Sequence, residues 1–253
     1  FLLINHPLDC PICDQGGECE LQDLALKYGS DKSSFSESKR VVNNIYIGSL
    51  VSTDLTRCIL CTRCVRFGEE ISGIKELGVV GRGLFSNIAT FLNNILTSEL
   101  SGNVIDICPV GALTSKPFRF KARSWEMKEF SSISPHDCLG SNLFLHTKNG
   151  YLMRVVPKEN NLINNVWISD KDRFSYEGVY SKDRLICPML KVDGVWKSCS
   201  FDEAFDYIFS IFSCILINDG PDSVGGLISN SSTIEEQFLF QKFMRSIGSD
   251  NID

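Results

Sequence analysis

The sequence predicts an α+β fold in two parts: a small, loop-rich, cysteine-rich domain over residues 1–125, and the start of an α/β domain over residues 131–253. Eight of the eleven cysteines lie in the first 138 residues, and six of those eight form tight clusters. From about residue 131 the pattern changes to strand, turn and helix signals, and a strand between helices is typical of an α/β layer.

The first part contains three stretches that we expect to be short helices. Residues 20–28 precede Gly29, a common helix stop, and residues 62–72 would bury Val65, Phe67 and Ile71 before ending at Gly73. Residues 91–100 form the third, which ends near Gly102.

The second part begins with a hairpin. Residues 143–146 and 151–156 are predicted strands, and Lys148-Asn149-Gly150 between them favours a tight turn. Two capping boxes then predict helices: Ser200 with Glu203 opens one that runs to about residue 217, and Thr233 with Glu236 opens one that runs to about residue 247. Residues 223–229 between them indicate a buried strand.

Composition excludes several classes of protein. An apolar share of 43% predicts a packed core, and a net charge of −6 argues against nucleic acid as a partner. The longest apolar run, 205–217, is too short to span a membrane. Neither a Gly-x-Gly-x-x-Gly fingerprint nor a Gly-Lys-Ser loop occurs, so NADH binding by this chain has no support.

The first metal-binding pattern is His6-x3-Cys10-x2-Cys13-x5-Cys19, four soft or borderline ligands within fourteen residues. Such spacing lets one loop curl around a [4Fe–4S] cluster, whose usual ligands are thiolates. Structural zinc also accepts three cysteines and a histidine, so zinc remains the alternative at this point. A disulfide framework is disfavoured, because no secretory signal opens the chain.

The second pattern is Cys58-x2-Cys61-x2-Cys64, a triple that is typical of ferredoxin-type clusters rather than of zinc. We expect Cys108 to be the fourth ligand, because Cys108-Pro109 matches the Cys-Pro ending of ferredoxin runs. Arg57, Arg63 and Arg66 flank the triple; they either offset the charge of the second cluster or form an ordinary solvated helix face. The remaining cysteines, Cys138, Cys187, Cys199 and Cys214, lack ligand spacing and are expected to be small buried apolar residues.

These motifs together resemble the large iron–sulfur subunit of respiratory complex I, NADH:ubiquinone oxidoreductase. The resemblance is carried by the two cysteine patterns and by residues 80–83, 99–102, 106–114, 167–171 and 173–174. It implies a ferredoxin-like first domain holding two [4Fe–4S] clusters, one on each ligand set, followed by the start of a molybdopterin-oxidoreductase-like domain. The family's amino-terminal [2Fe–2S] domain and most of its carboxy-terminal region have no counterpart in this sequence, so we expect a fragment, or a split or shortened gene product.

The resemblance also implies a function. Electrons from NADH, taken up by a flavin in a partner subunit, would pass through the clusters toward ubiquinone, with other peripheral-arm subunits as partners. The expected location is the matrix side of the mitochondrial inner membrane, or alternatively the cytoplasmic face of a bacterial membrane. The chain would have no substrate-binding active site, no nucleic acid partner and no membrane span of its own.

Some bacterial members of the family carry a further cluster on Cys-x2-Cys-x3-Cys-x27-Cys. The corresponding positions here are Ser134, Asp137, Ser141 and Ser169, so we expect no third cluster. Two alternatives remain. A zinc-bearing structural module shares the cysteines, and a molybdenum enzyme or an NAD-linked hydrogenase subunit shares the cluster modules. Too little of the molybdopterin-like region is present to hold that cofactor, so we expect no molybdopterin.

Overall fold

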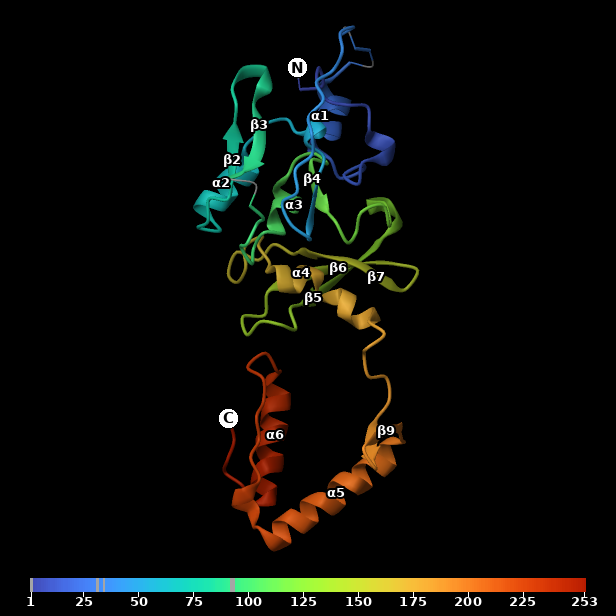
Figure 1. Ribbon diagram of the computed structural model, residues 1–253, viewed down its shortest axis with the longest axis vertical. Coiled ribbons are helices and arrows are strands. Elements are labelled where there is room, and N and C mark those ends of the chain that lie inside the picture. The colour runs from blue at the N-terminus through green and yellow to red at the C-terminus, as the bar shows by residue number, and fades with distance from the viewer. Residues whose placement is uncertain (1, 31, 34, 92–93) are drawn as a thin grey trace. The chain divides into compact units, whose positions relative to one another are not determined.

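The computed structural model (Figure 1) describes residues 2–30, 32–33, 35–91 and 94–253. It divides into two compact units, which are described separately. The first unit comprises Phe1–Ser134 with Ser141–Tyr176, and the second comprises Pro135–Gly140 with Glu177–Asp253. The sequence-based domain ranges, 1–125 and 131–253, stay a prediction.

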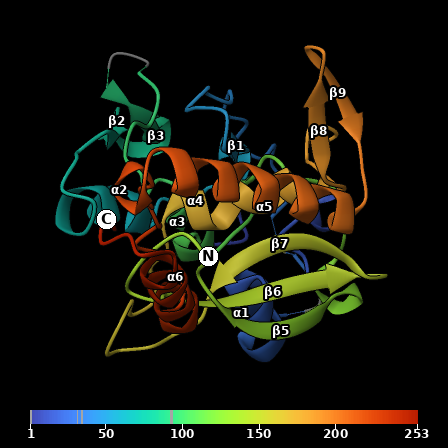
Figure 2. The ribbon, with the colours of Figure 1, turned by 90° about the horizontal axis from the view of Figure 1, so that it is seen from below.

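Small helices and antiparallel strand pairs build the first unit. Its helices are α1 (Glu20–Tyr28), α2 (Arg63–Glu70), α3 (Asn103–Ile107) and α4 (Asp170–Phe174). Its strands are β1 (Val51–Thr53), β2 (Leu77–Val80), β3 (Asn87–Thr90), β4 (Leu113–Ser115), β5 (Lys128–Ile133), β6 (Asn142–Lys148) and β7 (Tyr151–Pro157). Strand β1 pairs with β4, β2 pairs with β3, and β5, β6 and β7 form one antiparallel sheet (Figure 2).

The predicted hairpin is confirmed. Lys148 pairs with Tyr151 across the turn, and Asn149 and Gly150 have φ angles of 52° and 82°. Two consecutive positive φ angles are what a tight type I′ turn requires, and Asn-Gly tolerates them best. Strand β5, which pairs with β6 on the other side, was not predicted from the sequence.

The helix predictions for the first unit meet mixed outcomes. The helix at 20–28 is confirmed as α1, and 62–72 contains α2, which ends at Glu70. Phe67 is buried and Val65 is half-buried, but Ile71, just after the helix, is 47% exposed. The prediction for 91–100 is wrong where it can be checked: residues 94–98 have no regular structure, and residues 92–93 lie outside the described residues. The helix in this region is α3, which begins after Gly102.

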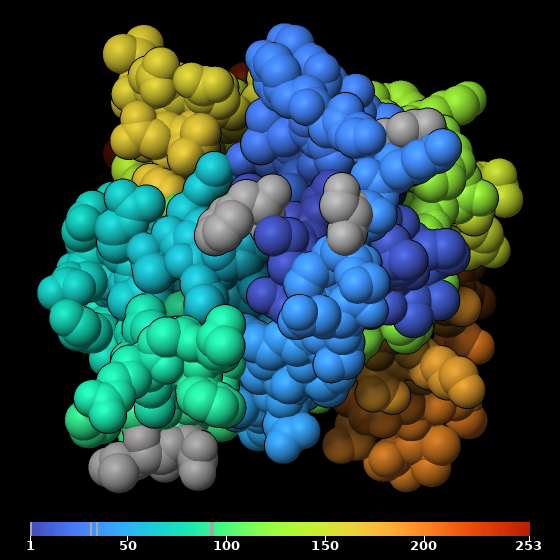
Figure 3. Space-filling view, turned by 90° about the horizontal axis from the view of Figure 1, so that it is seen from above, coloured from blue at the N-terminus to red at the C-terminus, as the bar shows by residue number. Residues whose placement is uncertain are grey.

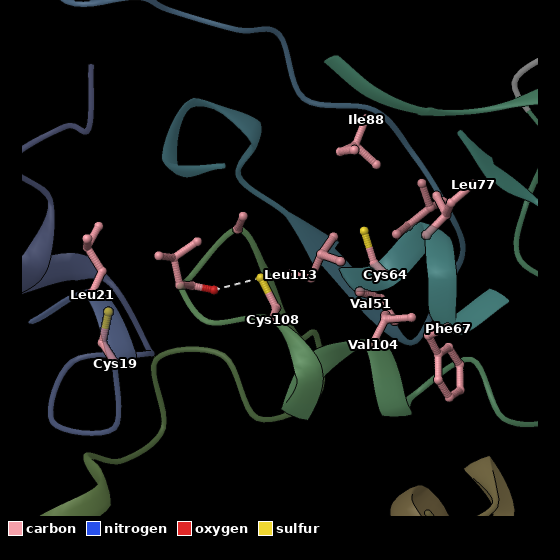
Figure 4. Packing of buried hydrophobic residues seen from close by; sticks show 13 residues of the cluster. Cys19, Leu21, Val51, Cys64, Phe67, Leu77, Ile88, Val104, Cys108 and Leu113 are labelled. Atoms are coloured by element: carbon pink, nitrogen blue, oxygen red, sulfur yellow. Dashed lines mark hydrogen bonds between the residues drawn. The ribbon is translucent and has the colours of Figure 1, made fainter. Parts of the chain in front are cut away.

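The core of the first unit lies between α1, α2, α3 and the β1–β4 pair (Figure 4). Three predicted ligands, Cys19, Cys64 and Cys108, belong to this core together with aliphatic residues and Phe67. A smaller core lies under the three-stranded sheet, where Leu143 and Val155 pack with Ile168 and Tyr176. These three cysteines are therefore part of the packing of the unit.

One face of the first unit shows the segment after α1 beside the β2–β3 hairpin (Figure 3). The Arg40 guanidinium fastens the two together, because its Nη1 donates to the carbonyls of Leu84 and Ser86 at 3.3 and 3.1 Å. A backbone hydrogen bond also joins the segment after α1 to the chain that follows the hairpin, since the Leu96 amide donates to the Ile47 carbonyl at 2.9 Å.

The second unit consists of the hairpin β8 (Met189–Val192) and β9 (Val195–Ser198), followed by helices α5 (Phe201–Asn218) and α6 (Ile234–Ile247). Both predicted capping boxes are confirmed, with reciprocal Ser200–Glu203 and Thr233–Glu236 hydrogen bonds. The predicted buried strand at 223–229 is wrong. That segment forms an isolated bridge between Gly226 and Ile252, and the Ile228 amide donates to the Asp253 carbonyl at 3.0 Å, but these bonds do not extend into a strand.

Candidate metal centres

The first predicted ligand set gathers around one cavity of about 330 Å³. His6, Cys10, Cys13 and Cys19 all line it, so the structure brings the complete first set together. Cys13 and Cys19 are buried, and Cys10 is exposed. The remaining wall residues are Leu3, Asp9, Gly16, Leu21, Gln22, Ala25, Leu26, Arg57 and Gly111.

Local turns shape the loop that carries these cysteines. A short 3-10 helix, Cys10–Ile12, is followed by a turn in which the Gly16 amide donates to the Cys13 carbonyl at 3.0 Å. Gly17 has φ +93°, and a Cβ there would lie 2.6 Å from the Trp125 ring, so only glycine fits. Helix α1 starts directly after Cys19, which is its N-cap residue.

The surroundings of His6 favour the neutral imidazole, the form that binds metal. Its Nδ1 is buried and finds no hydrogen-bond partner among the described residues. Burial lowers the pKa of His6, and the Lys39 ammonium, which donates to the His6 carbonyl at 2.5 Å, lowers it further. A neutral imidazole with a free, buried nitrogen is costly unless that nitrogen gains a partner, and metal is one such partner.

The second predicted set, Cys58, Cys61, Cys64 and Cys108, lines another cavity. It is narrow, about 20 Å³, so the fit of a cluster here rests on the donor set and its enclosure and not on free volume. Apart from Thr62, its other lining residues are aliphatic: Leu55, Ile59, Ile88, Val110, Ala112 and Leu113.

Left-handed residues turn the chain between these cysteines. Leu60 and Thr62 have φ angles of 56° and 61°, which is unusual for residues other than glycine and occurs where surroundings impose it. The Leu60 amide donates to the Cys58 sulfur at 3.4 Å, as the backbone around a cluster ligand does. Cys64 lies in the first turn of α2.

The thiols are held in surroundings that oppose their ionisation. Burial raises the pKa of Cys64 to about 12 and that of Cys108 to about 11, and it also raises the pKa of Cys13 and Cys58. Thiolates are therefore favoured only when positive charge enters the cavity. Iron supplies that charge and binds the thiolate form, so both donor sets fit an iron–sulfur cluster chemically.

Cys108 is placed by contacts far along the chain. Asn103 in α3 is fully buried, and its side chain bonds to both the carbonyl and the amide of Ile168, at 2.8 and 3.1 Å. Arg173 pairs with Asp106 in the same helix, and Asp170 accepts from the Gly102 amide at 2.6 Å. The 167–173 segment thus fixes the helix that delivers Cys108.

A short turn separates the two sites. The Cys19 sulfur lies 3.6 Å from the carbonyl oxygen of Pro109, and Gly111 lines the first cavity, whereas Val110 lines the second. A Cβ at Gly111 would be 2.1 Å from the Cys13 sulfur. Figure 4 shows Cys19 and Cys108 on their separate elements, with the Cys108 thiol donating to the Val110 carbonyl at 2.9 Å.

The three arginines of the second motif do not act together. Arg57 is buried and lines the first cavity; Arg63 makes a two-pronged ion pair with Glu20 in α1, at 2.6 and 2.8 Å; and Arg66 is exposed. Sequence proximity to Cys58 gave no sign that Arg57 turns toward the other site.

The four cysteines outside the two ligand sets were expected to be buried. Cys138, Cys187 and Cys214 are exposed and Cys199 is half-buried, so the expectation that these thiols fill the core is wrong. In the described ranges, no three His, Cys, Asp or Glu side chains converge closely enough for a single metal ion. A cubane attaches its ligands to four separate iron corners, so its ligands stand further apart than those of one ion.

Family models match successive parts of the chain. An NADH-ubiquinone oxidoreductase-G iron–sulfur binding region matches residues 1–34, and the ferredoxin-like domain of NADH-quinone oxidoreductase subunit 3 matches 48–114. An NDSU1/NuoG-like 4Fe-4S domain matches 127–177, and a molybdopterin oxidoreductase model matches 184–253.

Relatives match along the whole chain. The 75 kDa subunit of NADH-ubiquinone oxidoreductase from Reclinomonas americana is 48% identical over 252 residues, which is 100% of this chain and 36% of the relative. The mitochondrial iron–sulfur protein 1 of NADH dehydrogenase [ubiquinone] from Solanum tuberosum is 48% identical over 253 residues, 100% of this chain and 34% of the relative. The chain belongs to this iron–sulfur subunit family.

Bacterial members of the family match as well. The corresponding NADH-quinone oxidoreductase subunit of Rickettsia bellii is 46% identical over 251 residues, 99% of this chain and 36% of the relative. The chain spans about a third of the length of these curated relatives. A chain in the crystal structure of an NAD+-reducing [NiFe]-hydrogenase in the H2-reduced state is 30% identical in sequence, and the match covers 48% of this chain and 53% of the hydrogenase chain. Its TM-score of 0.42 is too low to compare folds.

The four positions for which the sequence predicts no third cluster make hydrogen bonds within their own units. Ser134 and Ser169 both donate to the Asp172 carboxylate, the latter at 2.8 Å, and Ser169 caps α4. Ser141 is buried, and its carbonyl accepts from the Ser134 amide at 2.8 Å. Asp137, in the second unit, accepts from the Gly140 amide at 2.7 Å.

Within the described residues, no helix combines the length and hydropathy needed to cross a bilayer.

Proposed function

We propose that this chain relays electrons through two [4Fe–4S] clusters. The ligands of the first are His6, Cys10, Cys13 and Cys19, and those of the second are Cys58, Cys61, Cys64 and Cys108. Each cluster, when bound, supplies a one-electron carrier. The observation that carries the proposal is that each set of four lines a cavity of its own.

The protein's own contribution is to hold, enclose and separate the two carriers. Aliphatic side chains around the second set keep water away, which stabilises a cluster against loss and tunes its potential. The turn after Cys108 reaches the thiols of the first set, so a single backbone segment lies between the sites. Short separation favours electron exchange between carriers. No residue is assigned a bond-making or bond-breaking step on a substrate.

In a complete assembly, we propose, the chain serves NADH:ubiquinone oxidoreductase. Electrons would arrive from NADH through a flavin in a partner subunit and leave toward ubiquinone. The partners would be other subunits of the peripheral arm. The proposed location is the matrix side of the mitochondrial inner membrane, with the cytoplasmic face of a bacterial membrane as the alternative, because the similar chains come from both sources.

The proposal includes no third cluster and no molybdopterin. Residues 127–177, which match a 4Fe-4S domain model, contain a single cysteine, Cys138, and the positions that the resemblance assigns to a further cluster are Ser134, Asp137, Ser141 and Ser169. The resemblance to a molybdopterin oxidoreductase is confined to residues 184–253, which form two helices and a hairpin. The domain division into residues 1–125 and 131–253 belongs to the same proposal.

Metal analysis separates this function from a zinc-bearing structural module. We expect about eight iron and eight sulfide per chain after anaerobic purification or reconstitution, and two reduced-cubane signals by electron paramagnetic resonance (EPR) after dithionite reduction. About two zinc ions, with no paramagnetic signal even after reconstitution, would replace the relay by the zinc module. Stoichiometric molybdenum would overturn the exclusion of molybdopterin.

A further inference from the structure

Arg57 is next to the second ligand set in sequence but lies at the first ligand set in the structure. It directly precedes Cys58, the first ligand of the second set, yet its side chain lines the first cavity with Cys10, Cys13 and Cys19. The residue is 5% exposed. A guanidinium remains charged even when buried, so a fixed positive charge lies in the wall of the first site.

Ion pairs hold this charge in place. Arg57 Nε lies 3.2 Å from Asp9, and its Nη1 lies 2.9 Å from Asp54. Nη1 also donates to the Gly111 carbonyl at 3.4 Å. Asp9 is the residue before Cys10, and Gly111 lies against Cys13, so Arg57 connects two points on the wall of the first cavity.

Arg57 lines the first cavity and is not among the residues that line the second. The lining of the second cavity consists of the four cysteines, Thr62 and aliphatic side chains. The charge of Arg57 therefore lies at the first site.

We propose that Arg57 is a positioning residue of the first site, where its positive charge raises the midpoint potential of the cluster held by His6, and that it does not set the potential of the second cluster. A fixed positive charge stabilises the reduced, more negative state, and the stabilisation is larger in a buried site than in water. The inference rests on the proposed function.

The test is a redox titration of the full chain, followed by EPR, with iron and sulfide content as the check of loading. The first cluster is identified by its response to His6→Cys. Arg57→Gln should move the first midpoint downward and leave the second in place. Arg57→Lys, which keeps the charge, should restore most of the shift. Arg66→Gln is the matched control, because it removes the same charge from an exposed position two residues after Cys64 and should move neither midpoint.

A second variant separates charge from mere packing. Asp9→Asn removes the carboxylate that partly neutralises Arg57, so it should move the first midpoint upward, opposite to Arg57→Gln. If Arg57→Gln fails to load the first cluster, Asp9→Asn and Arg57→Lys decide. An upward shift with Asp9→Asn and a near-native potential with Arg57→Lys support the proposal.

Several results overturn it. These are a larger shift of the second midpoint than of the first with Arg57→Gln, an unchanged first midpoint in a fully loaded variant, and an unchanged or lower midpoint with Asp9→Asn. The proposed function fails separately: a wild-type chain with zinc and no cubane signals rejects the relay itself. Two wild-type cubanes with no response to Arg57 reject only the role of Arg57.

Discussion

The Cys19 sulfur lies 3.6 Å from the carbonyl oxygen of Pro109, a residue 90 positions away that directly follows Cys108. A single residue, Pro109, thus joins a predicted ligand of the second site to a contact with a predicted ligand of the first. Because the two cavities share this wall, the residues in it constrain both ligand sets. The predictions below test that wall, the ligands and the contacts that hold them.

Gly111→Ala should remove the first cluster selectively. The added Cβ would lie 2.1 Å from the Cys13 sulfur, far inside van der Waals contact, so the thiol must leave its place. Iron should fall from about eight to about four per chain, with one cubane signal retained. Gly78→Ala is the control, since nothing lies within 4 Å of a Cβ at that position. If Gly111→Ala still binds about eight iron per chain, the segment around Gly111 can move enough to accommodate the added Cβ.

His6→Cys should retain a cluster but lower its midpoint potential. A thiolate brings a negative charge where the neutral imidazole has none, and histidine ligation raises potentials in Rieske centres. EPR-monitored titration measures the change, and the second cluster in the same sample is the internal reference. An unchanged first midpoint would mean that His6 is not a ligand.

Cys108→Ser should abolish the second cluster. Cys108 is buried in the wall of the second cavity, and the loss of its thiolate leaves three ligands for the second cluster. About four iron per chain should remain. Cys214→Ser, at an exposed cysteine of α5, should keep the full complement. Equal iron in both variants would remove Cys108 from the ligand set.

Arg154→Gln should weaken the attachment of the first ligand loop to the three-stranded sheet. Arg154 in β7 makes a two-pronged ion pair with Glu18, the residue before Cys19, at 2.7 and 2.6 Å. Because this pair is partly buried and two-pronged, its loss should cost about 1–2 kcal/mol of unfolding free energy. Urea denaturation measures the loss, and iron release to a chelator should quicken.

The matched control for Arg154 is Lys75→Gln. Lys75 pairs with Glu69 at 2.9 Å, but both side chains are more than half exposed, at 61% and 52%. Its loss should cost less than about 0.5 kcal/mol and leave iron release unchanged. If the two variants behave alike, the Arg154–Glu18 pair does not secure the ligand loop.

Local features of the fold were predictable from the sequence. The capping boxes at Ser200 and Thr233 and the Asn149-Gly150 turn were predicted and are present, because each depends on residues no more than a few positions apart. Predictions that needed partners failed. The 223–229 segment bonds to residues 251–253 without forming a strand, and apolar residues near position 95 do not make a helix by themselves.

By itself, the sequence determined the kind of chemistry: two sets of four donors, with spacings that predict iron–sulfur clusters and a family that the relatives establish. Only the tertiary structure decided which charged side chains and which backbone segments line each cavity. Arg57 turns away from its neighbour Cys58 toward the first cavity, and Gly111 fits against Cys13, because long-range packing and ion pairs with Asp9 and Asp54 fix them. Ligand spacing is a local property of the chain, whereas the surroundings of a ligand are assembled from segments far apart in sequence.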